Sequence, residues 1–101
     1  MYRGTTPTLT FGLPFATDNI KSLYITFVDK NDSIVLEKDI ASCTLSGKSV
    51  SVTLTQEETL ALEGRSETRI QLRVLDNNGT ALASDIITVQ VKEILKDGVI
   101  E

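Results

Sequence analysis

Residues 67–84 carry the sequence ETRIQLRVLDNNGTALAS, and this stretch decides the fold class of the chain. Isoleucine, leucine and valine take every second position of its first half, with arginine and glutamine between them. This two-residue period is typical of a strand that buries one face and leaves the other in water. Residues 76–79 contain an Asn-Gly pair, which readily adopts the left-handed backbone conformations of a tight hairpin turn. The stretch therefore predicts an antiparallel hairpin between residues 67–75 and 80–84.

Other parts of the chain repeat this strand character. Valine, isoleucine and threonine account for 30 of the 101 residues, a β-branched content that favours strands over helices. Further turn-forming segments lie at residues 29–32 and 46–48. Residues 29–40 and 76–86 also share one pattern, which predicts two similar hairpins. The remaining segments with strand character are residues 8–13, 22–28, 33–38, 43–45, 49–54 and 87–91.

One segment, residues 55–64, departs from the two-residue period. Thr55 is placed to cap a helix and Glu58 to return a hydrogen bond to it, the pattern of a capping box. Acidic residues fill the first turn, and Gly64 can end the helix. We expect a short crossover helix whose Leu60, and to a lesser extent Leu62, closes one end of the sheets.

Together these segments predict an all-β chain of six or seven short antiparallel strands with one short crossover helix. Two sheets packed face to face are the economical way to bury such strands. We expect residues 1–91 to form this β-sandwich domain, and residues 92–101 to form a C-terminal tail or a short last strand.

The composition excludes most enzyme chemistry. Histidine and tryptophan are absent and cysteine occurs once, which removes Ser-His-Asp and Cys-His catalysis, histidine zinc sites and any intrachain disulfide. The lone Cys43 has no neighbouring base or cation, so we expect a small buried hydrophobic residue. Fourteen acidic and ten basic residues give a net charge of −4, which attracts neither nucleic acid nor an anionic membrane. We therefore expect no enzyme, and no nucleic acid, membrane or cofactor as a partner.

Two motifs suggest ligand binding, but each lacks further residues that such a site requires. Residues 47–49 (Gly-Lys-Ser) match the end of a phosphate-binding loop, but the glycine required five positions earlier is replaced by Ser42. Residues 29–32 offer oxygen donors for calcium, yet a calcium loop needs about six oxygens and a closing acid. The next acid is Glu37, which lies within a predicted strand. We expect no metal site.

Six residues are candidates for contacts with a partner protein. Arg69 and Arg73 lie on the polar face of a predicted strand, where they are either solvated or face an acidic strand of a partner. Four aliphatic residues lie in the last ten positions, which form either a frayed tail or an apolar arm that docks on a neighbouring subunit. These four are Ile94, Leu95, Val99 and Ile100.

Several segments together resemble a phage protein family. Residues 3–13 (RGTTPTLTFGL) are similar to the opening of the N-terminal domain of siphophage upper baseplate proteins, with a short charged-Gly-Thr entry into the first strand. The likeness continues through residues 54–60, residues 70–79 and residues 86–91. The chain also resembles small prophage-encoded β-sandwich proteins of gut Gram-positive bacteria.

This resemblance implies an immunoglobulin-like antiparallel β-sandwich that serves as a non-enzymatic phage or prophage structural protein, in the tail or the baseplate. Its partners would be other phage tail or baseplate proteins, with a homo-oligomer as a further option. The chain stops at Glu101, where an upper baseplate protein continues, so we expect an adaptor or decoration role instead of direct receptor binding. Residues 1–7 lack the apolar run of a secretion signal. We therefore expect the bacterial cytoplasm when the chain is made, and the virion once it is assembled.

A second hypothesis is a standalone immunoglobulin-like binding module that recognises a cell-surface glycan or peptide. It predicts secretion and a pocket lined with aromatic side chains, whereas the chain has only three phenylalanines and two tyrosines. A third hypothesis, a hydrolase that relies on carboxylates alone, would require paired acids on the two sides of a pocket.

Overall fold

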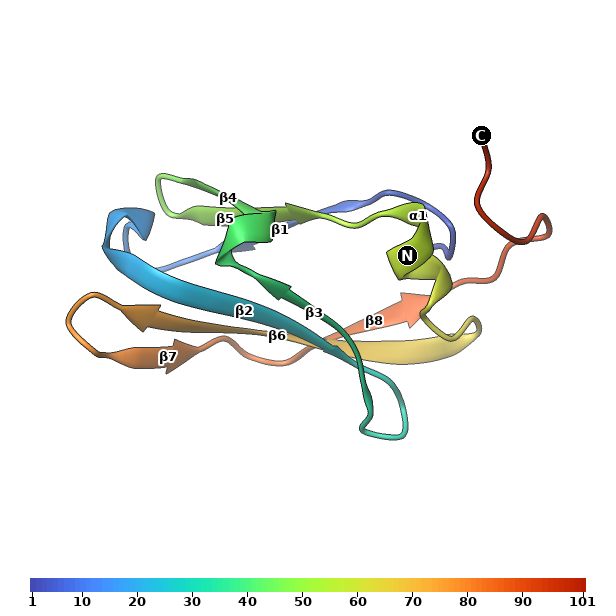
Figure 1. Cartoon of the computed structure of the whole chain (residues 1–101). Coiled ribbons are helices and arrows are strands. Elements are labelled where there is room, and N and C mark those ends of the chain that lie inside the picture. The colour runs from blue at the N-terminus through green and yellow to red at the C-terminus, as the bar shows by residue number, and fades with distance from the viewer.

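The computed structural model describes all 101 residues, as eight strands, one α-helix and two short 3-10 helices (Figure 1). The helix α1 (Gln56–Leu60) connects β5 to β6, and the 3-10 helices lie at Thr17–Asn19 and Ile40–Ser42. None of the helices has both the length and the apolar character needed to cross a lipid bilayer. The strands are β1 (Thr8–Gly12), β2 (Ile20–Val28), β3 (Ile34–Asp39), β4 (Cys43–Ser46), β5 (Ser49–Thr53), β6 (Ser66–Asp76), β7 (Ala81–Ala83) and β8 (Ile87–Val91).

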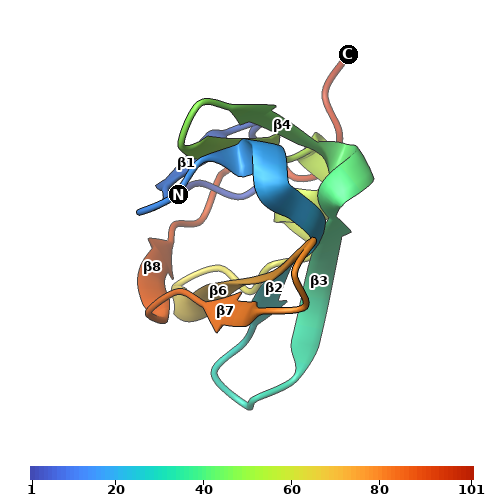
Figure 2. The ribbon, with the colours of Figure 1, turned by 90° about the vertical axis from the view of Figure 1, so that its left-hand side faces the viewer.

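The strands form two antiparallel sheets packed face to face. One sheet has the order β1-β5-β4; in the other, β3, β2 and β6 lie side by side, and both β7 and β8 pair with the second edge of β6. Seen end-on, β1 and β4 lie in one layer and β2, β6 and β7 in the other (Figure 2). The predicted sandwich is confirmed, and its strand order corresponds to two sheets of an immunoglobulin-type domain. The strands number eight instead of six or seven, because all eight segments with strand character form strands, including the short β4 and β7.

Two hairpins of the five-stranded sheet share one turn structure, as the internal similarity predicts. In the β2–β3 turn, Asp29 Oδ1 accepts the backbone N–H groups two and four residues further on, at 2.8 and 3.0 Å. In the β6–β7 turn, Asp76 Oδ1 does the same at 2.9 and 2.8 Å. The left-handed position of each turn is occupied by Asp32 (φ 63°) or Gly79 (φ 83°). Each turn is thus fixed locally by an aspartate that bonds its own backbone.

The hydrophobic core lies between the two sheets. Every second residue along the middle of β2 points into it, and Leu23, Ile25 and Phe27 have no exposed surface. The alternation in the sequence therefore identifies the core-facing side of this strand. The main cluster consists of Phe11, Ile20, Leu23, Ile25, Phe27, Val50, Val52, Leu54, Ile70, Leu72 and Val74.

Helix α1 begins at the predicted capping box. Thr55 Oγ1 accepts the backbone N–H of Glu58 at 3.1 Å, and Glu58 Oε1 accepts that of Thr55 at 2.8 Å. The helix has only five residues, and Leu62, just beyond it, is 1% exposed. Leu60 is half-buried, so Leu62 is the more deeply buried of the two leucines expected at this end of the sandwich.

A salt bridge joins α1 to the edge strand β3. Lys38 pairs in register with the buried Ile25 and so projects from the core-facing side of β3, and its Nζ lies 2.5 Å from Glu58 Oε2. The two side chains expose only 14% and 20% of their area. Burial by itself raises the pKa of Glu58, but the hydrogen bonds from Lys38 and Thr55 outweigh it and hold the pKa below its ordinary value.

We expect this pair to make the fold sensitive to acid. Because the pKa of Glu58 is lowered by folding, its contribution to stability is complete above its ordinary value of 4.5 and is lost as the pH falls through the lowered pKa. Glu58→Gln keeps a residue suited to the capping box but removes the charge. Its melting temperature should therefore fall less than that of the wild type between about pH 5 and about pH 3.

Circular dichroism melts across this pH range measure the difference. Glu57→Gln removes an exposed charge from the same turn of α1 and is the matched control, which should follow the wild type. Parallel curves for wild type and Glu58→Gln would contradict the role given to the Lys38–Glu58 pair.

Candidate assembly surfaces

The last ten residues fold back onto the N-terminal residues and helix α1. Lys92 and Tyr2 form a parallel bridge, in which the Lys92 N–H donates to Met1 O at 2.7 Å and the Arg3 N–H donates to Lys92 O at 3.1 Å. No strand forms in residues 93–101, and this segment, here called the tail, continues past the end of β8 (Figure 1). The two ends of the chain are therefore tied together.

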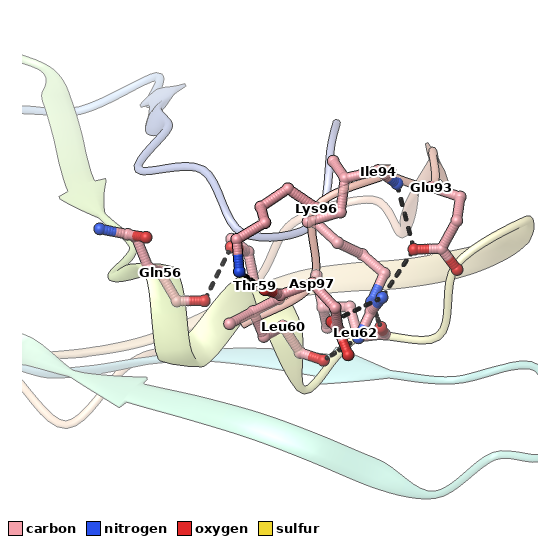
Figure 3. A network of polar contacts seen from close by, with 9 residues as sticks. Gln56, Thr59, Leu60, Leu62, Glu93, Ile94, Lys96 and Asp97 are labelled. Atoms are coloured by element: carbon pink, nitrogen blue, oxygen red, sulfur yellow. Dashed lines mark hydrogen bonds and ion pairs between the residues drawn. The ribbon is translucent and has the colours of Figure 1, made fainter. Parts of the chain in front are cut away.

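Arg3 connects three parts of the chain at this end. Its Nη2 and Nε donate to the carbonyl oxygens of Leu60 and Leu62 at 2.9 and 3.0 Å, at the C-terminal end of α1 where carbonyls lack helical partners. Its Nη1 donates to Glu93 Oε1 at 2.6 Å and lies 3.9 Å from Asp97 Oδ1. Figure 3 shows Glu93 and Asp97 of the tail beside Leu60 and Leu62. The hydrogen bond from Arg3 also holds the pKa of Glu93 below its usual range.

A second contact holds the far end of the tail. Gln56 Nε2 donates to Ile100 O at 3.1 Å, and Gln56 Oε1 accepts the Ile100 N–H at 2.8 Å. These bonds secure the backbone but leave three aliphatic side chains in water: Leu95 is fully exposed, Val99 is 46% exposed and Ile100 is 60% exposed. We call these three residues the tail patch. The fourth predicted contact, Ile94, is half-buried and lies outside the tail patch.

The two predicted arginine contacts have different surroundings. Arg69 forms an ion pair with Asp32 and donates to Asp29 O at 3.3 Å, so it secures the β2–β3 turn. Arg73 is exposed on the same face of β6 and has no ion-pair partner within the chain. Of the two arginines, Arg73 is the one whose charge is available to a partner.

Three further residues with exposed polar or aromatic side chains lie on the outer face of the five-stranded sheet and were not predicted from the sequence. Tyr24, in the middle of β2, is 48% exposed and lies in one row with Asp39 on β3 and Arg73 on β6. Glu37 stands in the next row on β3 and, with Tyr24 and Arg73, lines a hollow of about 370 Å³. The two-residue period of residues 22–28 is sufficient to put Tyr24 on the polar face of its strand, but which side chains lie beside it depends on the register of three strands.

The single thiol of the chain, on Cys43, is not activated for nucleophilic chemistry. Burial raises the pKa of the Cys43 thiol, and the nearby Asp39 charge raises it further, so the thiol is a poor nucleophile. Cys43 is half-buried, whereas full burial was expected, because β4 is an edge strand.

The carboxylates that a calcium ion would use already have partners in the chain. Asp29 accepts hydrogen bonds from turn amides, and Asp32 forms an ion pair with Arg69. No three Cys, Asp or Glu side chains gather at one point.

Comparison with known proteins supports the fold. No protein-family model and no curated protein matches the chain. Among solved structures, the chain is similar to the crystal structure of CopC from Methylosinus trichosporium OB3b, with a TM-score of 0.59 and 10% sequence identity. The similarity covers 96% of this chain and 87% of CopC, which is also a β-sandwich.

At 10% sequence identity, the likeness to CopC concerns the architecture alone.

Proposed function

We propose that this chain is a non-enzymatic structural protein of a phage or prophage, a tail or baseplate component that assembles with other tail proteins. The observation that carries the proposal is the tail patch. Its three side chains stay in water although the segment is held at both ends, by the hydrogen bond from Arg3 to the Glu93 side chain and by those between Gln56 and the Ile100 backbone. An anchored segment that presents aliphatic side chains is suited to a contact with a neighbouring subunit.

The shape of the molecule supports the same proposal. The chain exposes 6205 Å², whereas a compact monomer of 11.0 kDa exposes about 5600 Å². It is flat, with extents of 47 × 30 × 17 Å. The outer edges of β1, β3 and β4 are unpaired within the chain, and such edges accept strands of other proteins.

Mass spectrometry of particles pelleted after prophage induction in the source strain tests this function. We expect peptides of this chain in the particles at stoichiometric levels. Absence from the particles, with the protein abundant in the soluble lysate, would overturn the proposal.

A variant series tests whether the tail patch makes the contact. Replacement of Leu95, Val99 and Ile100 by serine should leave the fold intact but remove the protein from the particles, because no core contact is lost. Ile34→Ser, which changes an equally exposed aliphatic residue on β3, is the matched control and should still be incorporated. Equal incorporation of all variants would show that the tail patch is not the contact.

A standalone binding module remains the second candidate, favoured by the exposed Tyr24 beside its hollow. An aromatic ring next to Glu37 and Arg73 offers a platform and polar groups to a glycan or a peptide. Saturable binding to a glycan array, lost in Tyr24→Ala, would favour this candidate over assembly.

A further inference from the structure

The outer face of the five-stranded sheet carries opposite charges on the two sides of β2. Tyr24 lies in the middle of β2 and is in register with Asp39 on β3 and with Arg73 on β6. Glu37, two residues before Asp39 and on the same face, adds a second acid to the β3 side. The face thus has two acids on β3, an aromatic residue on β2 and the unpaired Arg73 on β6, in that order.

These charges have no opposite charge to pair with inside the chain. Arg73 takes part in no ion pair, Glu37 accepts only the Thr26 hydroxyl at 3.1 Å, and the Asp39 carboxylate accepts only the Ser42 hydroxyl at 3.4 Å. Neighbouring strands are about 4.8 Å apart, so β2 keeps the arginine and the acids about two strand spacings from each other. A partner that carries the complementary pattern would satisfy both sides at once.

We propose that this face binds a second copy of the chain about a twofold axis that runs along β2. Rotation about such an axis exchanges the two sides of the face, so β6 of each copy lies over β3 of the other. Arg73 of one copy then meets Asp39 and Glu37 of the other, and symmetry repeats the contact. A twofold axis across the strands would place Arg73 over Arg73, so the charge pattern selects the axis along β2.

Tyr24 supplies an apolar anchor close to the axis. Because Tyr24 lies on β2, the axis brings the tyrosines of the two copies against each other, beside the hollows lined by Ser22, Thr26, Glu37 and Arg73 among others. Paired aromatic rings near the centre of an interface are typical binding anchors.

The axis along β2 sets the size of the interface. Rotation places β3, β2 and β6 of one copy over β6, β2 and β3 of the other, and leaves β7 and β8 outside the overlap. Three strands side by side are about 14 Å wide and the nine residues of β2 are about 30 Å long, which gives about 400 Å² per copy. Stable interfaces bury roughly 800 Å² on each partner, so this contact is a weak dimer that depends on its paired charges and is measured at high protein concentration.

This interface is distinct from the tail patch and goes beyond the proposed function, since it assigns a homodimer to a sheet face. The dimer is tested in solution on the purified full chain, whereas the structural role is tested in particles. A monomer in solution would overturn the dimer and leave the particle experiment unaffected.

Sedimentation equilibrium at about 100 μM protein measures the mass. We expect the wild type at twice 11.0 kDa, and Arg73→Glu at the monomer mass, because the new glutamate faces Asp39 and Glu37 of the other copy. Combining Arg73→Glu with Asp39→Arg should restore the dimer by exchanging the charges. A monomeric wild type, a dimeric Arg73→Glu or a monomeric charge exchange would each overturn the proposal.

Two matched variants keep this test specific. Lys48→Glu makes the same charge change at an exposed turn of the other sheet and should remain dimeric. Leu95→Asp disrupts the tail patch and should also remain dimeric. Loss of the dimer in either variant to the same extent as in Arg73→Glu would place the contact elsewhere. Circular dichroism melts confirm that the variants are folded.

Discussion

Replacing Phe27 with alanine is expected to lower the free energy of unfolding by about 3–5 kcal/mol. Phe27 has no exposed surface and packs in the main cluster between the two sheets. Replacing the ring loses the free energy gained by moving it out of water, and it leaves a cavity that the β-sheet backbone cannot close. The free energy of unfolding of a small domain is only about 5–15 kcal/mol, so this one substitution removes a large part of it.

Urea unfolding monitored by circular dichroism measures the loss. Leu95→Ala is the control, because it also shortens a large aliphatic side chain but at a fully exposed position. Its stability should stay within about 0.5 kcal/mol of the wild type. A loss of less than about 1 kcal/mol in Phe27→Ala would contradict the packing of the two sheets at this point.

Arg3→Met is expected to cost about 1.5–3 kcal/mol, through the lost hydrogen bonds to the Leu60 and Leu62 carbonyls, and to release the tail. Methionine keeps much of the aliphatic stem but removes all the hydrogen-bond donors. The carbonyls of Leu60 and Leu62 then lose a charged donor, and Glu93 loses the cation 2.6 Å away. The guanidinium joins the N-terminal residues, α1 and the tail, so its loss should act on all three together.

Two measurements check this prediction. Urea unfolding gives the loss of stability, and hydrogen exchange should show faster exchange at the backbone amides of residues 93–101. Lys30→Met is the control, because Lys30 pairs with Glu63 at 3.2 Å but both side chains are more than half exposed. Exposed pairs contribute about 1 kcal/mol or less. Equal effects of the two variants would show that Arg3 is no more than a surface cation.

The turns and the helix start could be predicted from the sequence because each depends on residues close together in the chain. Asp29 and Asp76 bond backbone amides two and four positions away, so the Asp-rich turn pattern is sufficient to locate both hairpins. Thr55 and Glu58 are three positions apart, and their capping box forms as expected. Each of these features depends only on residues within four positions of one another.

The surroundings of the candidate contact residues were predicted less completely, because they depend on distant segments. The aliphatic character of residues 94–100 was visible in the sequence, and Leu95, Val99 and Ile100, three of the four candidates named from it, are exposed. Nothing local indicated that Arg3, about ninety positions before Glu93, would hold the tail in place. The ion pair that separates Arg69 from Arg73 likewise joins residues 37 positions apart.

By itself, the sequence determined the fold class, the strand faces, the three hairpin turns and the start of the helix. It did so because hydrophobic period, turn chemistry and caps are local properties. Only the tertiary structure decided which strands are neighbours, and with them the row of Asp39, Tyr24 and Arg73. The physical reason is that register sets which side chains meet across a sheet, and register is fixed by packing among strands far apart in the chain.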